Sequence, residues 1–427
     1  MAQNPFGGGA GGDLPFDLNA LFAQVQSMLQ DFEGPINWPA ALDLARKTAA
    51  QTPDPTPSAG QSSAVSDALR LADLWIDGTT SFPSGVQTAA AWSRADWLVS
   101  TADVWHGLIT PVAASSVDTI ATQMPEELKA VAGPMVGFLG KAVGAMLAQQ
   151  AGQGLGTLAG EVLASSEIGI PLSTPGRAGI LPGNVKAFAD GLEGVGESDV
   201  LLYVALREAA HQRLFAGVPW LRQHVIEAVT AYAQGVEVDL GAIQRQVEER
   251  LQGLNPMDPS AMQELMGDAS LFAIEPSAAQ RAAQERVEIV LALVEGWVDE
   301  IVTEATHERM PSAALLQEAF RRRRAEGGPA EQTFATLIGL ELRPRRLRDA
   351  ATLWGSLRAR QGAEARDGVW MSPALLPTSA DLDDPLGFRE GASLPEEMSA
   401  DEFDAGLAAL LDGEPPAPGA EPAEPTE

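Results

Sequence analysis

The longest uninterrupted helical pattern in the chain, residues 278–309, limits the fold more than any other feature. Its apolar side chains recur at the spacing of one helix face: Val287, Val290, Leu291, Val294, Val298 and Ile301. A helix of this kind buries that face against other helices. Comparable patterns over residues 64–76, 199–215, 219–232 and 345–360 predict a mainly α-helical protein.

Shorter segments extend this prediction. Residues 88–109 predict a further core helix with Thr88 as its N-cap. Residues 52–62 are rich in Pro, Ser and Gly and predict a flexible linker. Between residues 168 and 185, Gly, Pro and isolated aliphatic residues predict loops and at most a short hairpin. An apolar stripe at 18–29 and a helical pattern at 331–340 add two more helices.

Composition divides the chain of 427 residues into three parts. Residues 1–13 are Gly-rich, and 381–427 contain 14 acidic residues and one Arg. Such segments bury too little apolar surface to fold alone. We therefore expect a disordered N-terminus over 1–13, a helical domain over 14–390 and a disordered, acidic, Pro-rich tail over 391–427.

Charge and cysteine content limit which partners and which metal ligands the chain can have. The net charge of −30 disfavours binding to nucleic acid and to anionic membrane surfaces. Thiolate metal sites and disulfides are excluded because the chain has no Cys.

The strongest candidate for a membrane span is 142–160, which has no charged residue but contains five Gly and three Gln. Its glycines at 152, 156 and 160 suit a close helix contact in a bilayer or in a tight soluble core. Since no export signal is visible at the start, the expectation is a cytoplasmic protein without a membrane span.

One short segment carries a nearly complete zinc-peptidase motif. The segment Arg207-Glu208-Ala209-Ala210-His211 matches His-Glu-x-x-His except at its first position. In that motif two His at i and i+4 hold Zn²⁺ on one helix face, and the Glu handles protons. Arg has no lone pair to give a metal. Either the chain derives from a metallopeptidase and no longer works as one, or it binds metal in another way.

Five segments in and beyond this motif form a recognisable set: LREAAHQRLF at 206–215, PWLR at 219–222, GGPAEQTF at 327–334, LRPRRLR at 342–348 and DLDDP at 381–385. Together they resemble the zincin-like-2 family, a group of actinobacterial proteins labelled as zinc-dependent metalloproteases or hydrolases. The resemblance extends over roughly residues 15–390, and it implies a helical zincin-like domain and a zinc cofactor.

The resemblance also implies roles for particular residues. Glu208 would be the catalytic general base, and His211 and Glu295 would be metal ligands. Asp299 follows Glu295 by one helical turn and would support a ligand from behind, as would Arg207. His224 has two possible roles. It replaces the missing His ligand across a helical hairpin, or it lies on a helix surface.

Two hypotheses follow. The first is a catalytically impaired relative that acts as a binding or scaffold protein for an unknown protein or peptide. The alternative is an active zinc-dependent metalloprotease or hydrolase. Under the first, Glu208 is an ordinary helix carboxylate paired with Arg213 or Arg207. We also predict that Arg207 forms a salt bridge with Asp299 or Glu295, because a guanidinium satisfies carboxylates that a metal would otherwise hold.

A cluster of arginines is the remaining conspicuous feature. Ten Arg and four acidic residues fall within residues 321–360, inside a strongly acidic chain. The basic patch between Arg321 and Arg360 pairs internally with acidic helices, or it docks an anionic partner or the acidic tail.

Overall fold

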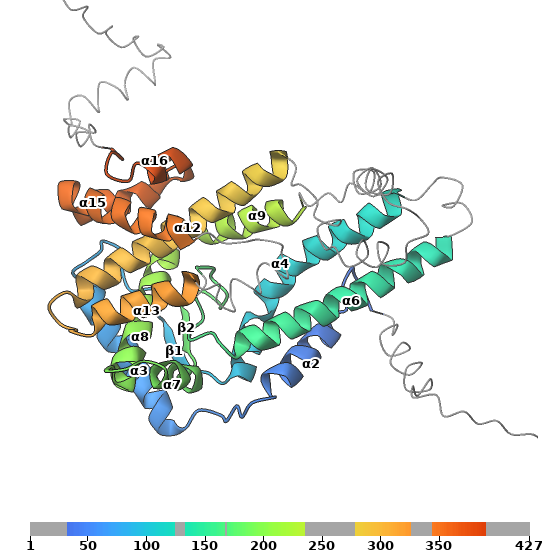
Figure 1. Cartoon of the computed structure of the whole chain (residues 1–427), viewed down its shortest axis with the longest axis horizontal. Coiled ribbons are helices and arrows are strands. Elements are labelled where there is room, and N and C mark those ends of the chain that lie inside the picture. The colour runs from blue at the N-terminus through green and yellow to red at the C-terminus, as the bar shows by residue number, and fades with distance from the viewer. Residues whose placement is uncertain (1–31, 124–132, 167–168, 235–277, 326–343, 390–427) are drawn as a thin grey trace, which may run out of the picture.

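The computed structural model describes residues 32–123, 133–166, 169–234, 278–325 and 344–389, and these form a mainly helical protein (Figure 1). The elements in chain order are α2 (Trp38–Ala49), α3 (Ala59–Ile76), β1 (Thr88–Ala91), α4 (Arg94–Gln123), α6 (Gly133–Ala159), β2 (Arg177–Ile180), α7 (Pro182–Asp190), α8 (Glu197–Gly217), α9 (Leu221–Gln234), α12 (Ala278–Thr306), α13 (Ala313–Ala325), α15 (Pro344–Gly368), the 3₁₀ turns η2 (Val369–Met371) and η3 (Pro373–Leu375), and α16 (Ser379–Asp383).

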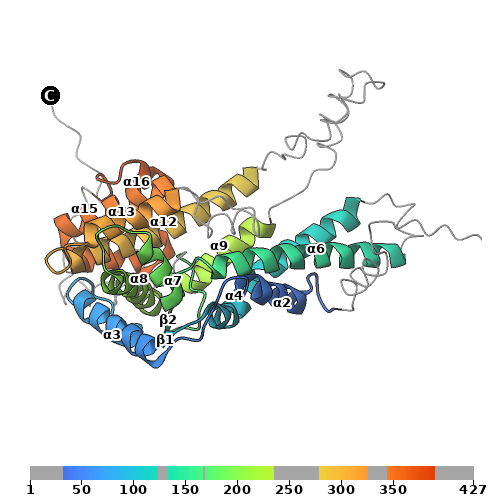
Figure 2. The same cartoon turned by 60° about the horizontal axis from the view of Figure 1, so that its bottom comes forward.

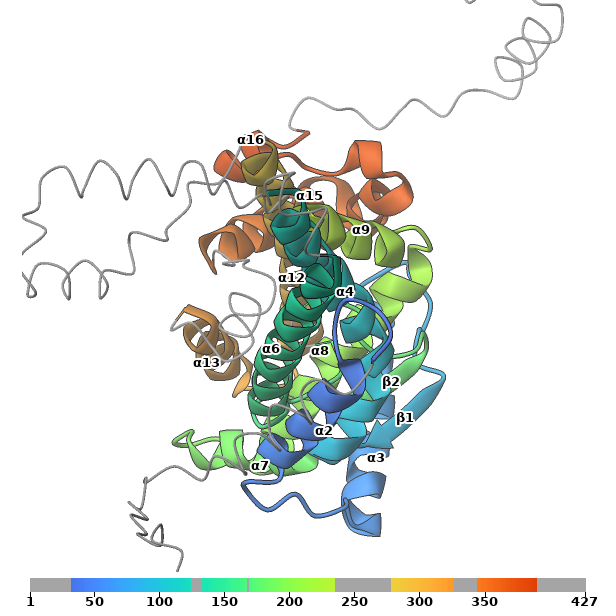
Figure 3. The ribbon, with the colours of Figure 1, turned by 90° about the vertical axis from the view of Figure 1, so that its right-hand side faces the viewer.

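The helices form a body and an arm. The long helices α4 and α6 lie side by side and extend away from the other elements, with α2 packed along α6 (Figures 1 and 2). Helices α3, α7, α8, α12, α13 and α15 gather at the opposite end. Figure 3 looks at the molecule from the side of the arm and shows α13 set apart from α6.

Helix α8 lies at the centre of the body, in contact with α3, α7, α12, α13 and β2. Every residue from 203 to 214 is buried, so this helix has no solvent face in that stretch. A helix buried all round places even its polar side chains inside the protein, where each needs a partner. The charged motif at 207–211 therefore lies in the core rather than on the surface.

Two glycines of α6 allow its close contact with α2. A Cβ atom added at Gly156 would lie 2.5 Å from Thr48 Cβ, and one at Gly152 would lie 2.7 Å from the Ala41 carbonyl oxygen. The segment proposed above as either a membrane span or a tight core contact thus packs within the protein. No helix in the described ranges is both long and apolar enough to cross a membrane.

The prediction for residues 88–109 is wrong at its start. Thr88–Ala91 forms strand β1, and helix α4 begins at Arg94 after a cap in which Ser93 and Asp96 exchange hydrogen bonds. Strand β1 pairs in parallel with β2, with Thr88 opposite Arg177. Residues 169–176 form a loop, as the composition of 168–185 predicts. In place of a short hairpin, the rest of that segment forms β2, which pairs in parallel with a distant strand, and the start of α7.

The predicted linker is shorter than expected. Helix α3 begins at Ala59 because Ser58 and Gln61 form a capping box. The preceding loop is anchored by Asp54, whose carboxylate accepts hydrogen bonds from the backbone N–H groups of Arg94 and Ala95.

Helix α12 confirms the long pattern that began the sequence analysis, with bounds Ala278–Thr306. The predicted segments at 1–13, 18–29, 331–340 and 391–427 lie outside the described residues. Two boundaries differ in detail. Pro219 precedes α9 instead of lying in its first turn, and α15 is broken at Gly362, where φ is +89°.

Candidate functional site

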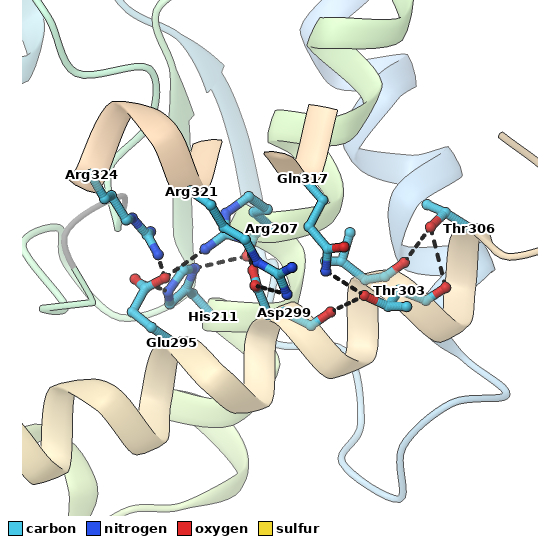
Figure 4. A network of polar contacts seen from close by, with 10 residues as sticks. Arg207, His211, Glu295, Asp299, Thr303, Thr306, Gln317, Arg321 and Arg324 are labelled. Atoms are coloured by element: carbon cyan, nitrogen blue, oxygen red, sulfur yellow. Dashed lines mark hydrogen bonds and ion pairs between the residues drawn. The ribbon is translucent and has the colours of Figure 1, made fainter. Parts of the chain in front are cut away.

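Four of the residues singled out from the sequence meet between two helices (Figure 4). Arg207 and His211 point from α8 toward α12, where Glu295 and Asp299 lie one turn apart. Residues four apart on a helix share a face, so each helix presents a pair of side chains to the other. The structure thus brings together four residues that are separated by up to 92 positions in the chain.

Arg207 bridges both carboxylates of α12. Its two terminal nitrogens lie 2.5 Å from Asp299 Oδ1 and 2.5 Å from Glu295 Oε2. The side chain is 5% exposed, and its guanidinium group lies 5.4 Å from the centre of the Phe320 ring. The predicted salt bridge is therefore present, and it involves both of the named acids.

His211 lies between two hydrogen-bond acceptors. Its Nδ1 is 2.8 Å from the Arg207 carbonyl oxygen, and its Nε2 is 3.0 Å from Glu295 Oε1. A backbone carbonyl and a carboxylate both accept hydrogen bonds, so each ring nitrogen of His211 has an acceptor within reach.

Two further arginines approach from α13. The Arg324 guanidinium lies 2.6 Å from Glu295 Oε2, and Arg321 lies 3.4 Å from Asp299 Oδ2. These contacts complete a cluster, which we call the arginine–carboxylate cluster and define as Arg207, His211, Glu295, Asp299, Arg321 and Arg324. It is largely buried, but the Arg321 side chain is 36% exposed.

The ionisation of the cluster follows from its charges. Burial alone would raise the pKa of Glu295, but Arg324, His211 and Arg207 outweigh it and hold that pKa well below its usual range. Burial alone would lower the pKa of Arg207, but Asp299 and Glu295 outweigh it and raise that pKa above its usual value. The carboxylate of Glu295 and the guanidinium of Arg207 therefore remain charged together.

Glu208 faces a different part of the structure. Its Oε1 accepts hydrogen bonds from Ser165 Oγ at 2.5 Å and Gln212 Nε2 at 2.9 Å, and its Oε2 accepts from the Ser166 backbone N–H at 3.0 Å. Burial raises the pKa of Glu208 even though these donors lower it. The carboxylate thereby joins α8 to the segment at Ala164, which bridges to β2.

The expected pairing of Glu208 with an arginine is wrong. Arg213 binds Asp73 at 2.8 Å and Asp77 at 2.7 Å on α3, and Arg207 binds the acids of α12. His224 lies on α9 with its ring 5.4 Å from that of Trp220 in an edge-on contact. That placement matches the helix-surface reading of His224.

The basic patch pairs internally at several points. In addition to the two arginines of the cluster, Arg346 binds Asp383 at 2.7 Å, and Arg358 binds Glu300 at 2.5 Å. Internal pairing, one of the two readings of this patch, therefore accounts for part of its charge.

The donor set does not fit a zinc ion. His211 Nε2 and Glu295 Oε1 are 3.0 Å apart, slightly closer than the distance of about 3.4 Å between two ligands of one tetrahedral zinc. The first position of the motif holds the Arg207 cation, and Arg324 binds the other oxygen of Glu295. Within the described ranges, no three His, Asp or Glu side chains converge as metal ligands would.

Sequence reasoning missed several residues of the site. Arg321 and Arg324 were counted only as members of a basic patch, and Ser165 and Ser166 were not noticed. Gly169 was also missed, although it adopts a φ of +73° and a Cβ there would lie 3.1 Å from Glu295. The four-arginine run was a visible signal, but no local pattern indicated which side chains of that run reach α12.

Comparisons with known proteins agree with this architecture. A candidate hydrolase with a novel fold from Chloroflexus aurantiacus is similar in structure, with a TM-score of 0.58 and 18% sequence identity. The match covers 82% of this chain and 96% of that one, and at this identity it supports the fold alone. No curated protein matches the chain. The model of the zincin-like metallopeptidase family matches residues 36–388, and the chain therefore belongs to that family.

Proposed function

We propose that this chain is a non-catalytic member of its family, in which an arginine takes the place of the metal. The observation that carries the proposal is the Arg207 guanidinium, which binds Glu295 and Asp299 at 2.5 Å each. A cation fixed to both carboxylates satisfies the charge that a zinc ion would otherwise neutralise. The preserved helical body then serves as a binding or scaffold protein for a peptide or protein partner.

The surroundings of Glu208 support the same proposal. A general base needs a free oxygen within hydrogen-bond reach of the proton that it removes. Both oxygens of Glu208 accept hydrogen bonds from Ser165, Ser166 and Gln212 in a fully buried position. We therefore assign Glu208 a structural role.

Metal analysis tests the proposal directly. The wild-type protein, purified in the presence of zinc and then desalted, should contain far less than one zinc per chain. Arg207→His should restore a second imidazole ligand and raise zinc affinity by about 100-fold or more, because even groups that only support a metal ligand contribute about 10–100-fold. Adding Arg324→Gln should raise the affinity further, because it frees one oxygen of Glu295.

The control is His211→Ala in the Arg207→His background, which should abolish the gained affinity. One tightly held zinc in the wild type, lost in His211→Ala, would contradict the proposal. That result would favour an active zinc-dependent hydrolase with Glu208 as its general base.

A further inference from the structure

A cavity of about 220 Å³ lies directly beside the arginine–carboxylate cluster. It is lined by Asp299, Glu318, Arg321, Arg322, Arg324, Leu347 and Arg348. Because bulk water occupies about 30 Å³ per molecule, the space corresponds to roughly seven waters. It is smaller than the sites that hold drug-sized ligands, which begin at about 300 Å³.

Positive charge exceeds negative charge at this cavity. Among the described residues, its lining has four guanidinium groups and two carboxylates. Asp299 is bound from behind by Arg207 at 2.5 Å and Arg324 by Glu295 at 2.6 Å, so these two outside partners cancel and leave the excess of positive charge unchanged. The cavity is therefore cationic, although the whole chain carries a net charge of −30.

Arg321 has hydrogen-bonding capacity to spare. Its Nε is shielded from solvent and has no hydrogen-bond partner among the described residues. Its contact with Asp299 Oδ2 is long, at 3.4 Å. The Arg321 side chain is 36% exposed and lines the cavity, so a terminal nitrogen of its guanidinium group is placed to donate to an anion there.

We propose that this cavity binds a small oxyanion, with carboxylate or phosphate as the recognised group. Guanidinium groups bind both groups through paired hydrogen bonds, so several arginines around one small space favour a multiply charged ligand. Of the lining residues that the structure describes, Leu347 alone is apolar, so this part of the lining favours a polar ligand. The inference goes beyond the proposed loss of catalysis, since it assigns the site a ligand of opposite charge to a metal ion.

Titration calorimetry on the full chain tests the inference. Inorganic phosphate and succinate are titrated separately in chloride buffer at constant ionic strength. At least one should bind saturably with one site per chain, and the tighter of the two identifies the recognised group.

The variants locate the site. Arg321→Gln and Arg348→Gln should each weaken binding by about tenfold or more, as expected for loss of a charge-assisted hydrogen bond. Arg348 is exposed on α15, so its replacement leaves the buried cluster intact. The matched control is Arg70→Gln on α3, which removes the same charge from an exposed side chain and should leave affinity unchanged.

Two results would overturn the inference. The first is the absence of saturable binding for both anions. The second is an equal loss of affinity in Arg70→Gln and Arg348→Gln, which would indicate general electrostatic attraction. Neither result depends on the zinc content of the protein, so failure here is distinguishable from failure of the proposed function.

Discussion

Arg207 on α8 stands where the zinc-peptidase motif has its first His, and this one difference replaces a metal ligand by a cation. A guanidinium is a planar fork with several donors, and it can therefore reach two carboxylates placed one helical turn apart on α12. Arg207 uses two different nitrogens for Glu295 and Asp299. A lysine ammonium is a single point of charge and could not span the same two partners equally well.

At this scale we predict that Arg207→Met destabilises the protein by about 3–5 kcal/mol, the usual consequence of removing one partner of a buried ion pair. The reason is that Glu295 and Asp299 would remain buried with one cation fewer. Urea denaturation followed by circular dichroism measures the free energy of unfolding. Arg70→Met is the control, because its pair with Asp67 is exposed and should contribute about 0–1 kcal/mol. Equal effects in the two variants would contradict a structural role for the cluster.

The sequence predicts part of this site for a physical reason. Positions 207 and 211 share a helix face, as do 295 and 299, so spacing alone indicates which side chains face one partner. The partners of Glu208 could not be predicted, because Ser165 and Ser166 lie in an irregular segment more than 40 residues away. Loop residues approach a helix through tertiary packing, for which a single sequence has no periodic signal.

At the scale of elements, the contact of α2 with α6 depends on missing side chains. Glycine in a helix interior costs about 0.5–1 kcal/mol relative to alanine, so its retention at Gly156 indicates a steric requirement. Thr48 Cβ and the Ala45 carbonyl oxygen would lie 2.5 Å and 2.7 Å from an added Cβ. Backbone and β-branched atoms have little freedom to move away.

We therefore predict that Gly156→Ala destabilises the protein by about 1–3 kcal/mol, as overpacked positions do. Gly107→Ala on α4 is the matched control, because nothing lies within 4 Å of its added Cβ. The free energy of unfolding of the control should rise by about 0.5–1 kcal/mol, because alanine has the higher helix propensity. Thermal and urea unfolding measure whether the free energy of unfolding falls in Gly156→Ala and rises in Gly107→Ala. Stabilisation by Gly156→Ala would exclude the close contact.

Strand β1 shows where the prediction of secondary structure from local sequence fails. Thr88–Ala91 reads Thr-Ala-Ala-Ala, and alanine has the highest helix propensity of all residues. Pairing with β2, almost 90 positions later, overrides that preference. Helix α12 was predictable because its apolar period continues from Val287 to Ile301, about four turns.

At the scale of the whole molecule, one buried acid joins the two ends of the described chain. Asp367, at the end of α15, accepts hydrogen bonds from Thr80 Oγ1 at 2.6 Å and from the Ser81 backbone N–H at 2.8 Å. It also accepts from Trp297 Nε1 at 3.0 Å and pairs with the fully buried Arg366. These contacts join residues up to 287 positions apart, which no local pattern could have indicated.

We predict that Asp367→Ala lowers the free energy of unfolding by about 3–5 kcal/mol, because the buried Arg366 loses its nearest carboxylate, at 2.9 Å, and keeps the more distant Glu304 at 3.7 Å. The unfolding transition should shift as one step if this acid couples the two ends. Asp190→Ala, which removes an exposed pair with Lys186, should have an effect within about 0.5 kcal/mol. A separate early transition in Asp367→Ala would show instead that α15 unfolds independently.

The cationic cavity inside an acidic molecule has a consequence for the speed of ligand capture. An anion approaching from a distance is repelled by the net charge of −30 before it senses the arginines. That repulsion extends about 30 Å at 0.01 M salt but about 8 Å at 0.15 M. Added salt should therefore accelerate the encounter while weakening the final contacts, so that the association and dissociation rate constants both rise with ionic strength.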